Sequence, residues 1–125
     1  MADLNRLLAA TDLSAPARHA VERAAFVAMD IGAALDLVHV ASLAPLDKLR
    51  RLVAAMPEGL EQRMLEAVEQ ELRELAAALL RHHGVHAGVH LGAGSLLPEL
   101  TRQADERAAD LLVLGARGAN FMRHL

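Results

Sequence analysis

The most constraining feature of this sequence is the alternation of short apolar runs with longer segments of helical periodicity. The apolar runs lie near residues 6–10, 35–40, 85–91 and 110–114. Between them, apolar side chains recur every three or four residues, which is typical of helices that bury one side. Strands that alternate with helices become parallel neighbours joined by right-handed crossovers. The pattern predicts an α/β fold: a doubly wound parallel sheet in the order 3-2-1-4, with helices on both faces.

Capping residues mark the ends of the predicted helices. Ser14 is a typical N-cap with Pro16 in the first turn behind it, and Gly32 is placed to end the same helix. The clearest helix runs from about residue 58 to residue 83 and ends before Gly84. These residues indicate where the chain leaves the predicted sheet and where it returns.

Two shorter helices complete the pattern. The apolar spacing between Pro45 and Pro57 allows a short amphipathic helix. A turn over residues 92–95 leads into the second helix, whose buried side is expected to include Leu97 and Leu100.

Composition excludes several classes of function. The 125 residues fit one domain, and 54% hydrophobic against 23% charged residues indicates a folded core. Aromatic residues are only 2%, so platforms for stacking nucleic-acid bases are missing. The net charge of −3 argues against a nucleic-acid partner, because proteins that bind nucleic acids present basic surfaces. Without cysteine, disulfides and cysteine-bound zinc are excluded.

No segment of the sequence has the pattern of a targeting signal or a membrane span. The N-terminus carries Asp3 before its first basic residue and has no long apolar run. Later apolar stretches are interrupted by Asp36, Pro45 and Asp47, well short of the roughly 20 residues that cross a bilayer. We therefore expect a cytoplasmic protein with no membrane partner.

Two loops are candidates for ligand binding. Thr11-Asp12-Leu13-Ser14 follows the first strand, and Gly115-Ala116-Arg117-Gly118 follows the fourth. Ligands of open α/β sheets bind beyond the carboxyl ends of the strands. The glycine pair lets backbone N–H groups approach an anion, Arg117 supplies a counter-charge, and Asp12 can accept hydrogen bonds from ribose hydroxyls. Each loop alone also fits an ordinary turn or helix cap, but together they suit a nucleotide.

The sequence resembles the universal stress protein family along its whole length. The segments that carry the resemblance are residues 7–14 (LLAATDLS), Ala24-Ala25, residues 37–40 (LVHV) and residues 109–118 (ADLLVLGARG). Members of that family have five parallel strands, usually form homodimers, and divide into branches that do and do not bind ATP. The resemblance implies an adenine nucleotide as ligand, namely ATP alone or with Mg²⁺, and a homodimer.

The resemblance also implies roles for particular residues. The segment ending in Asp12 would lie against the ribose and adenine, Val40 would pack on the adenine, and Gly115 would begin the phosphate cradle. The full set of predicted cofactor-binding residues is Ala10, Thr11, Asp12, Val40, Gly115, Arg117 and Gly118.

The ATP-binding branch carries a longer glycine motif than this sequence contains. Its pattern has two glycines three apart, then nine residues, then Gly followed by Ser or Thr. Gly115 and Gly118 supply the first half, and the second half would fall beyond Leu125, as would the fifth strand. We expect residues 1–125 to be one domain truncated at its C-terminus, continued by a helix and a fifth strand. Otherwise the apolar edge of residues 110–114 should pair with a second copy.

The histidines do not indicate a metal site. His82, His83, His86 and His90 lie close in sequence, but no carboxylate is expected beside them to complete a shell. His39, inside a predicted central strand, is expected to be a hydrogen-bonded core histidine rather than a general base.

Enzymatic motifs are missing from the sequence. It contains no GxSxG, HExxH, complete P-loop or GxGxxG, so no residue is predicted to be catalytic and ATP hydrolysis would at most be slow. Two functions remain: a stress-response regulator that binds an adenine nucleotide, or an interaction protein of the same fold that binds none and acts through dimerisation. A fragment of a nucleotide-dependent synthetase or flavoprotein is a weaker third alternative.

Overall fold

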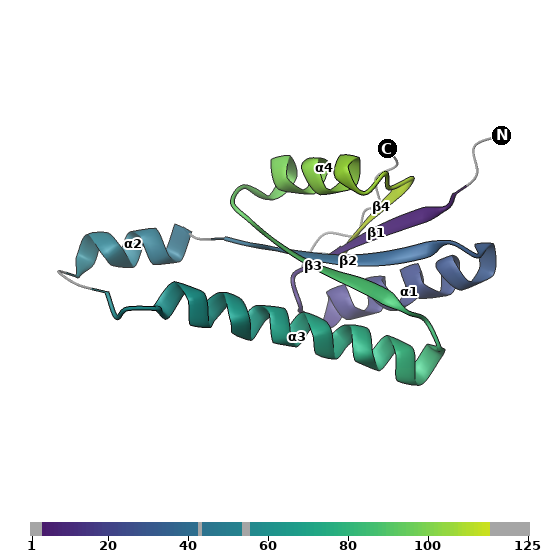
Figure 1. Cartoon of the computed structure of the whole chain (residues 1–125), viewed down its shortest axis with the longest axis horizontal. Coiled ribbons are helices and arrows are strands. Elements are labelled where there is room, and N and C mark those ends of the chain that lie inside the picture. Colours follow the sequence, from purple (N-terminus) through teal and green to yellow (C-terminus); the bar gives the residue numbers. More distant parts are fainter. Residues whose placement is uncertain (1–3, 43, 54–55, 116–125) are drawn as a thin grey trace.

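The predicted strands form one parallel sheet in the predicted order (Figure 1). The computed structural model describes residues 4–42, 44–53 and 56–115, and within them the strand order is β3-β2-β1-β4. The strands are β1 (Arg6–Thr11), β2 (Ala34–Ala41), β3 (Ala87–Ala93) and β4 (Leu111–Gly115); the helices are α1 (Ala15–Ile31), α2 (Ala44–Leu52), α3 (Leu60–His83) and α4 (Leu96–Glu106).

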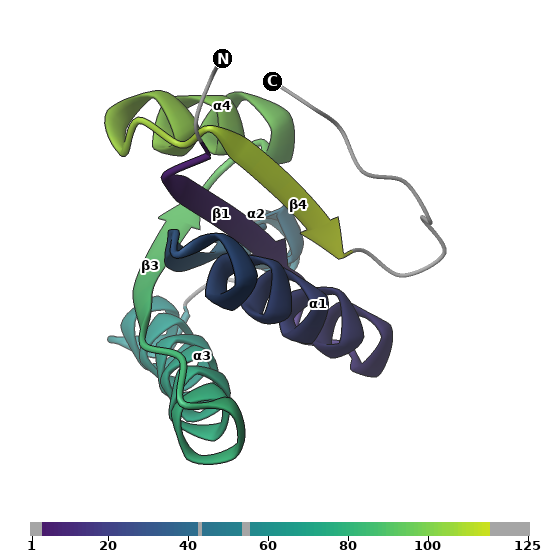
Figure 2. The same cartoon turned by 90° about the vertical axis from the view of Figure 1, so that its right-hand side faces the viewer.

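Helices cover both faces of the sheet, as the alternation predicts. Figure 2 shows α1 and α3 on one side of the strands and α4 on the other. Successive strand residues point to opposite faces, so β1 contributes Leu7 and Ala9 to the core beneath α1 and α3, and Leu8 and Ala10 to the core beneath α4. β1 is therefore apolar on both sides, which explains why it appears in the sequence as a continuous apolar run.

β1 is the central strand, and its amino end is fixed to β4 by a carboxylate. Asp110 Oδ2 accepts hydrogen bonds from the backbone N–H groups of Asn5 at 2.8 Å and Arg6 at 3.0 Å. The Asp110 N–H in turn donates to the carbonyl of Arg6 at 2.8 Å. These bonds lie immediately before the first paired residues, Leu7 and Leu111, and hold the register of the two strands.

The glycines expected to end helices α1 and α3 do so. Gly32 and Gly84 adopt the left-handed conformation, with φ of 69° and 68°, and their N–H groups bond carbonyls of the last helical turn. Ser14 caps the start of α1, where its side chain accepts a hydrogen bond from the N–H of Ala17 at 3.3 Å. The local residues thus determine where these helices begin and end.

β3 is displaced by two residues from its predicted position. Val85 is buried in the core on the α1 and α3 side, but it precedes the paired residues, and the strand continues through Gly92 and Ala93. The turn occurs at Gly94, which has φ 111° and donates its N–H to the carbonyl of Ala41 at 3.1 Å. Pairing with the end of β2 therefore extends β3 past the point where its alternation ends.

Helix α4 starts after Ser95 as expected, but its buried side differs from the prediction. Leu100 is buried, whereas Leu97 is 62% exposed. Leu97 belongs to the first turn of α4, where its side chain faces solvent.

The missing side chain at Gly92 lets an acidic side chain of α4 lie on β3. A Cβ atom at Gly92 would come within 2.5 Å of Glu99 Oε2. The Glu99 carboxylate accepts hydrogen bonds from Arg102 Nε at 2.7 Å and Nη2 at 2.8 Å, and from Gln103 Nε2 at 3.1 Å. Donation from Arg102, followed by that from Gln103, lowers the pKa of Glu99 from 4.5 to about 2.

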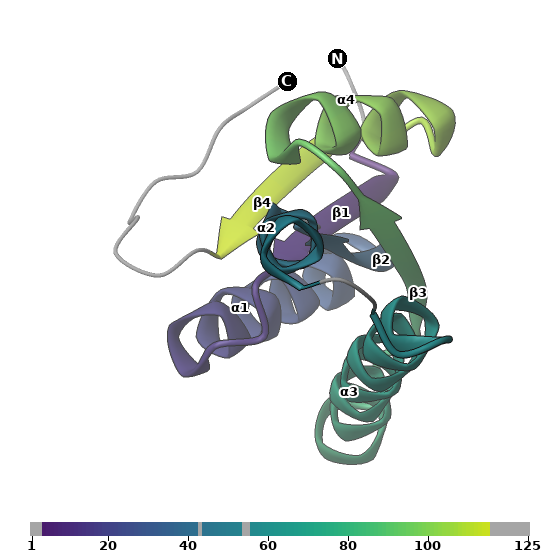
Figure 3. The same ribbon diagram turned by 90° about the vertical axis from the view of Figure 1, so that its left-hand side faces the viewer.

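Helix α2 stands apart from the packed layers. Figures 1 and 3 place it beyond the carboxyl ends of the strands, and the side chains of residues 47–52 are all exposed. An ion pair between Arg50 Nη2 and Glu61 Oε2, 2.7 Å long, links it to the start of α3. Nowhere in the described part of the chain is a helix both long and apolar enough to span a membrane.

The end of α4 offers a test of backbone strain. Ala108 occupies a left-handed position with φ 52°, and the bonds from Ala108 N to Asp105 O and from Ala109 N to Ala104 O form a Schellman motif. Because glycine avoids the Cβ penalty of this conformation, Ala108→Gly should raise the free energy of unfolding by about 0.5–1 kcal/mol. Chemical denaturation measures the change.

The matched control is Ala77→Gly, the same chemical change on an exposed turn of α3. It should lower the free energy of unfolding by about 1 kcal/mol, because helical φ gives glycine no advantage there. Equal destabilisation by the two variants would contradict the strain at Ala108.

The lowered pKa of Glu99 predicts a loss of stability in acid. Because the folded-state pKa lies below the unfolded value, the stabilisation is complete above about pH 4.5 and is lost as the pH falls toward 2. Urea unfolding between pH 6 and pH 2 should therefore show a smaller acid loss for Glu99→Gln than for the wild type. Arg102→Met, which removes the main donor, should shrink the loss as well. An equal loss of unfolding free energy between pH 6 and pH 2 in all three proteins would show that the Glu99 carboxylate is not the cause of the acid loss.

Candidate functional site

The carboxyl ends of β1 and β4 lie side by side at a topological switch point. Thr11 is paired with Gly115, and Ala10 with Leu114. From β1 the chain passes through α1 to β2 on one side, whereas β4 lies on the other side of β1. Crevices at such a reversal of strand order are the usual ligand sites of open α/β sheets.

Two of the predicted residues form an apolar surface on the α4 face of this edge. Ala10 is buried at the end of β1, and Val40 is half-buried near the end of β2. Both belong to the cluster of apolar side chains beneath α4, which also includes Leu114. Val40 keeps part of its apolar side chain exposed, and an apolar side chain in this position suits the flat face of a base.

The turn after β1 is built from side chains that bond its own backbone. Thr11 Oγ1 accepts a hydrogen bond from the N–H of Leu13 at 3.0 Å, and Asp12 Oδ1 accepts one from the N–H of Ser14 at 2.9 Å. Leu13 takes a positive φ of 65°, which is costly for a residue with a side chain. The bonds hold this conformation and leave the Asp12 side chain exposed at the rim. Nothing in the residue type of Leu13 predicts its conformation.

His39 connects the ends of β1 and β2. Its Nδ1 lies 2.7 Å from the carbonyl oxygen of Thr11, and the ring is half-buried. The expectation of a hydrogen-bonded histidine within a central strand is confirmed. Its partner, 28 residues away, could not be identified from the sequence.

The predicted site residues on the described strands therefore converge on one edge of the sheet. These residues are Ala10, Thr11, Asp12, Val40 and Gly115. Arg117 and Gly118 lie outside the described residues, so their part in the site stays a prediction.

The histidines near the third strand have acidic neighbours, contrary to expectation. His90 Nε2 lies 2.9 Å from Asp36 Oδ1, and Arg6 Nη2 lies 3.8 Å from Asp36 Oδ2. Gly88 leaves room for this carboxylate, because a Cβ there would overlap Asp36 Oδ1. Strand pairing brings these residues together from positions 54 apart, which the local spacing of histidines could not indicate.

His83 is also packed more closely than a solvated helix end would be. Its ring meets that of Phe26 edge to face, with centroids 4.9 Å apart, and its Nε2 lies 3.9 Å from Glu22 Oε2. Over the described ranges 4–42, 44–53 and 56–115, no three histidine or acidic side chains are grouped so as to hold a metal ion.

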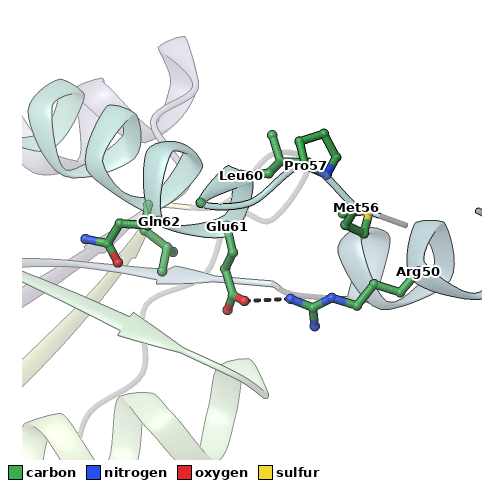
Figure 4. Close-up of a pocket in the computed structure, with 8 residues that line it drawn as sticks. Arg50, Met56, Pro57, Leu60, Glu61 and Gln62 are labelled. Carbon is green, nitrogen blue, oxygen red and sulfur yellow. Dashed lines mark hydrogen bonds and ion pairs between the residues drawn. The ribbon is translucent and has the colours of Figure 1, made fainter. Parts of the chain in front are cut away.

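A separate cavity of about 330 Å³ lies at the junction of α2 and α3 (Figure 4). Met56, Pro57 and Leu60 contribute to its lining, and the ion pair between Arg50 and Glu61 crosses one side of it. Because Arg50 also bonds Asp47 at 3.3 Å, its charge is already neutralised by carboxylates. This cavity includes none of the predicted site residues.

Comparisons with solved structures find the same fold in proteins of modest sequence identity. A universal stress family protein from Burkholderia pseudomallei is 25% identical, with a TM-score of 0.68 over 93% of this chain and 84% of the other. The universal stress protein UspA from Lactobacillus plantarum is 20% identical, with a TM-score of 0.62 over 96% of this chain and 82% of the other. A universal stress protein in complex with cAMP is 22% identical, with a TM-score of 0.61 over 89% of this chain and 71% of the other.

No curated protein matches the sequence. The family model for universal stress proteins, in contrast, matches residues 4–125, which is nearly the whole chain. The strand order, the edge formed by β1 and β4, and this match lead to one conclusion: the chain belongs to the universal stress protein family.

Proposed function

We propose that this chain is a cytoplasmic stress-response regulator that binds an adenine nucleotide at the carboxyl edge of β1 and β4. The observation that carries the proposal is the pairing of Thr11 with Gly115 at the switch point of the sheet. This pairing juxtaposes the turn that presents Asp12 with the start of the glycine loop. The family membership and the relative in complex with cAMP support the same ligand class.

Each part of a nucleotide has a matching group at this edge. The apolar pair Ala10 and Val40 suits the adenine ring, and the exposed carboxylate of Asp12 suits the ribose hydroxyls. Gly115, with Arg117 and Gly118 after it in sequence, suits the phosphates. We propose ATP, alone or with Mg²⁺, as the ligand.

A second candidate function rests on the edge of β4. In the described sheet, β4 is paired with β1 alone, and residues 111–114 are all apolar. An unpaired apolar edge favours association with another strand. This observation supports a homodimer, which is compatible with nucleotide binding and would be the main activity of a member that binds none.

The role of Asp12 yields a direct test. Asp12→Ala should weaken ATP binding by about 1–3 kcal/mol, because ribose hydroxyls would lose their acceptor. Isothermal titration calorimetry of wild type and variant measures this difference. Mass analysis of any nucleotide released on denaturation of the purified wild type identifies the natural ligand.

Asp30→Ala is the matched control, since Asp30 is exposed near the end of α1, distant in the fold from the carboxyl edge. It should bind ATP like the wild type. Thermal unfolding of the Asp12 variant checks that loss of the bond to Ser14 has not unfolded the turn. Equal affinity in all three proteins would place the ribose elsewhere, and no binding by the wild type would leave the dimer as the function.

A further inference from the structure

The carbonyl of Thr11 receives its hydrogen bond from a side chain. The pairing between β1 and β2 ends with Ala10 and Val38, so Thr11 and His39 are the first residues of these two strands that are not paired with each other. There the Thr11 carbonyl oxygen lies 2.7 Å from His39 Nδ1. Because a carbonyl oxygen only accepts hydrogen bonds, Nδ1 must carry the hydrogen, and the neutral ring is the Nδ1–H tautomer.

This bond controls the direction in which the chain leaves β1. The Thr11 carbonyl belongs to the peptide plane that joins Thr11 to Asp12, so fixing its oxygen fixes the first step of the turn. The hydrogen bonds that Thr11 Oγ1 and Asp12 Oδ1 accept from the N–H groups of Leu13 and Ser14 are internal to the turn, and they hold Leu13 at its costly φ of 65°. The His39 ring supplies an anchor from a neighbouring strand.

His39 is also directly bonded in the chain to Val40, the residue proposed to bind the base on the other side of the site from Asp12. Val40 follows His39 directly, and it faces the cluster beneath α4. The strand alternation puts the His39 ring on the other face, so the ring anchors β1 while its neighbour presents an apolar side chain. One residue thereby sets the separation between the Asp12 turn and Val40.

We propose that His39 is a positioning residue of the nucleotide site, an inference that rests on the proposed function. Its Nδ1–H bond to Thr11 holds Asp12 at the correct distance from Val40 for a ribose and its base to be bound together. The ring itself does not contact the ligand. Loss of the donor should therefore weaken binding although both binding side chains remain.

Three substitutions of His39 distinguish the effect of its hydrogen-bond donor on ATP binding from the effect of its side-chain volume. Asn places its Nδ2 the same number of bonds from the backbone as His Nδ1, whereas Gln places its amide nitrogen one bond further, and Leu has no donor. We expect His39→Asn to bind ATP within about threefold of the wild type, and His39→Leu to bind about tenfold or more weakly. His39→Gln should lie between them. A ring that merely filled space would favour Gln and Leu over Asn.

The matched control is His86→Leu, since His86 is exposed and precedes β3. It should bind ATP as the wild type does. Thermal unfolding of every variant identifies any that fails to fold, and the Asn and Gln variants still decide the question if the Leu variant does. Equal ATP affinity for the wild type, Gln and Leu proteins would overturn the role of His39.

A measurement on the wild type alone tests the bond without any ligand. Long-range ¹H–¹⁵N correlation spectra at alkaline pH should show the His39 hydrogen on Nδ1. A hydrogen on Nε2 would overturn the inference even if nucleotide binds. If the tautomer is as expected but the wild type binds no nucleotide, the proposed function fails and the positioning role fails with it.

Discussion

The whole sheet depends on the pairing of β1 with strands on both of its sides. β1 is buried on both faces and connects β2 to β4, so its register decides which side chains reach the carboxyl edge. A shift of one residue would move Ala10 to the α1 face and bring Thr11 beneath α4. At the amino end of β1 the Asp110 carboxylate accepts hydrogen bonds from Asn5 and Arg6, and at the carboxyl end His39 Nδ1 bonds the carbonyl of Thr11. These bonds hold the register of β1 against β4 and β2 beside the last paired residues.

The fold could be predicted from local signals, and so could the sheet edge on which the described candidate residues meet. Apolar runs, helical periodicity and the glycines at 32 and 84 each depend on nearby residues, and together they identified the strands in their order and the ends of α1 and α3. The boundaries of β3 were wrong because Gly92 and Ala93 extend the strand only through pairing with β2. Contacts such as His90 with Asp36 were missed for the same reason: they form between strands, where sequence spacing carries no information.

The two glycines of β3 illustrate how a strand makes room for charge. At Gly88 the space is taken by Asp36, and at Gly92 it is taken by Glu99. Both carboxylates are largely shielded, with exposed fractions of 14% and 12%, and each is partnered by a cation or a histidine. A glycine in a strand usually weakens it, yet here each one allows a polar side chain to lie on the sheet with its hydrogen bonds satisfied.

Helix α2 differs from the other helices in having no buried side among its described residues. An isolated helix of nine residues is barely stable in water, so its hydrogen bonds should open and close without disturbing the sheet. Leu49 and Leu52 are the apolar side chains among residues 47–52, and both are exposed, so melting this part of the helix would uncover little new apolar surface. Residues 47–52 therefore add little to the heat capacity change or to the denaturant dependence of unfolding, both of which report mainly on the sheet and the helices packed against it.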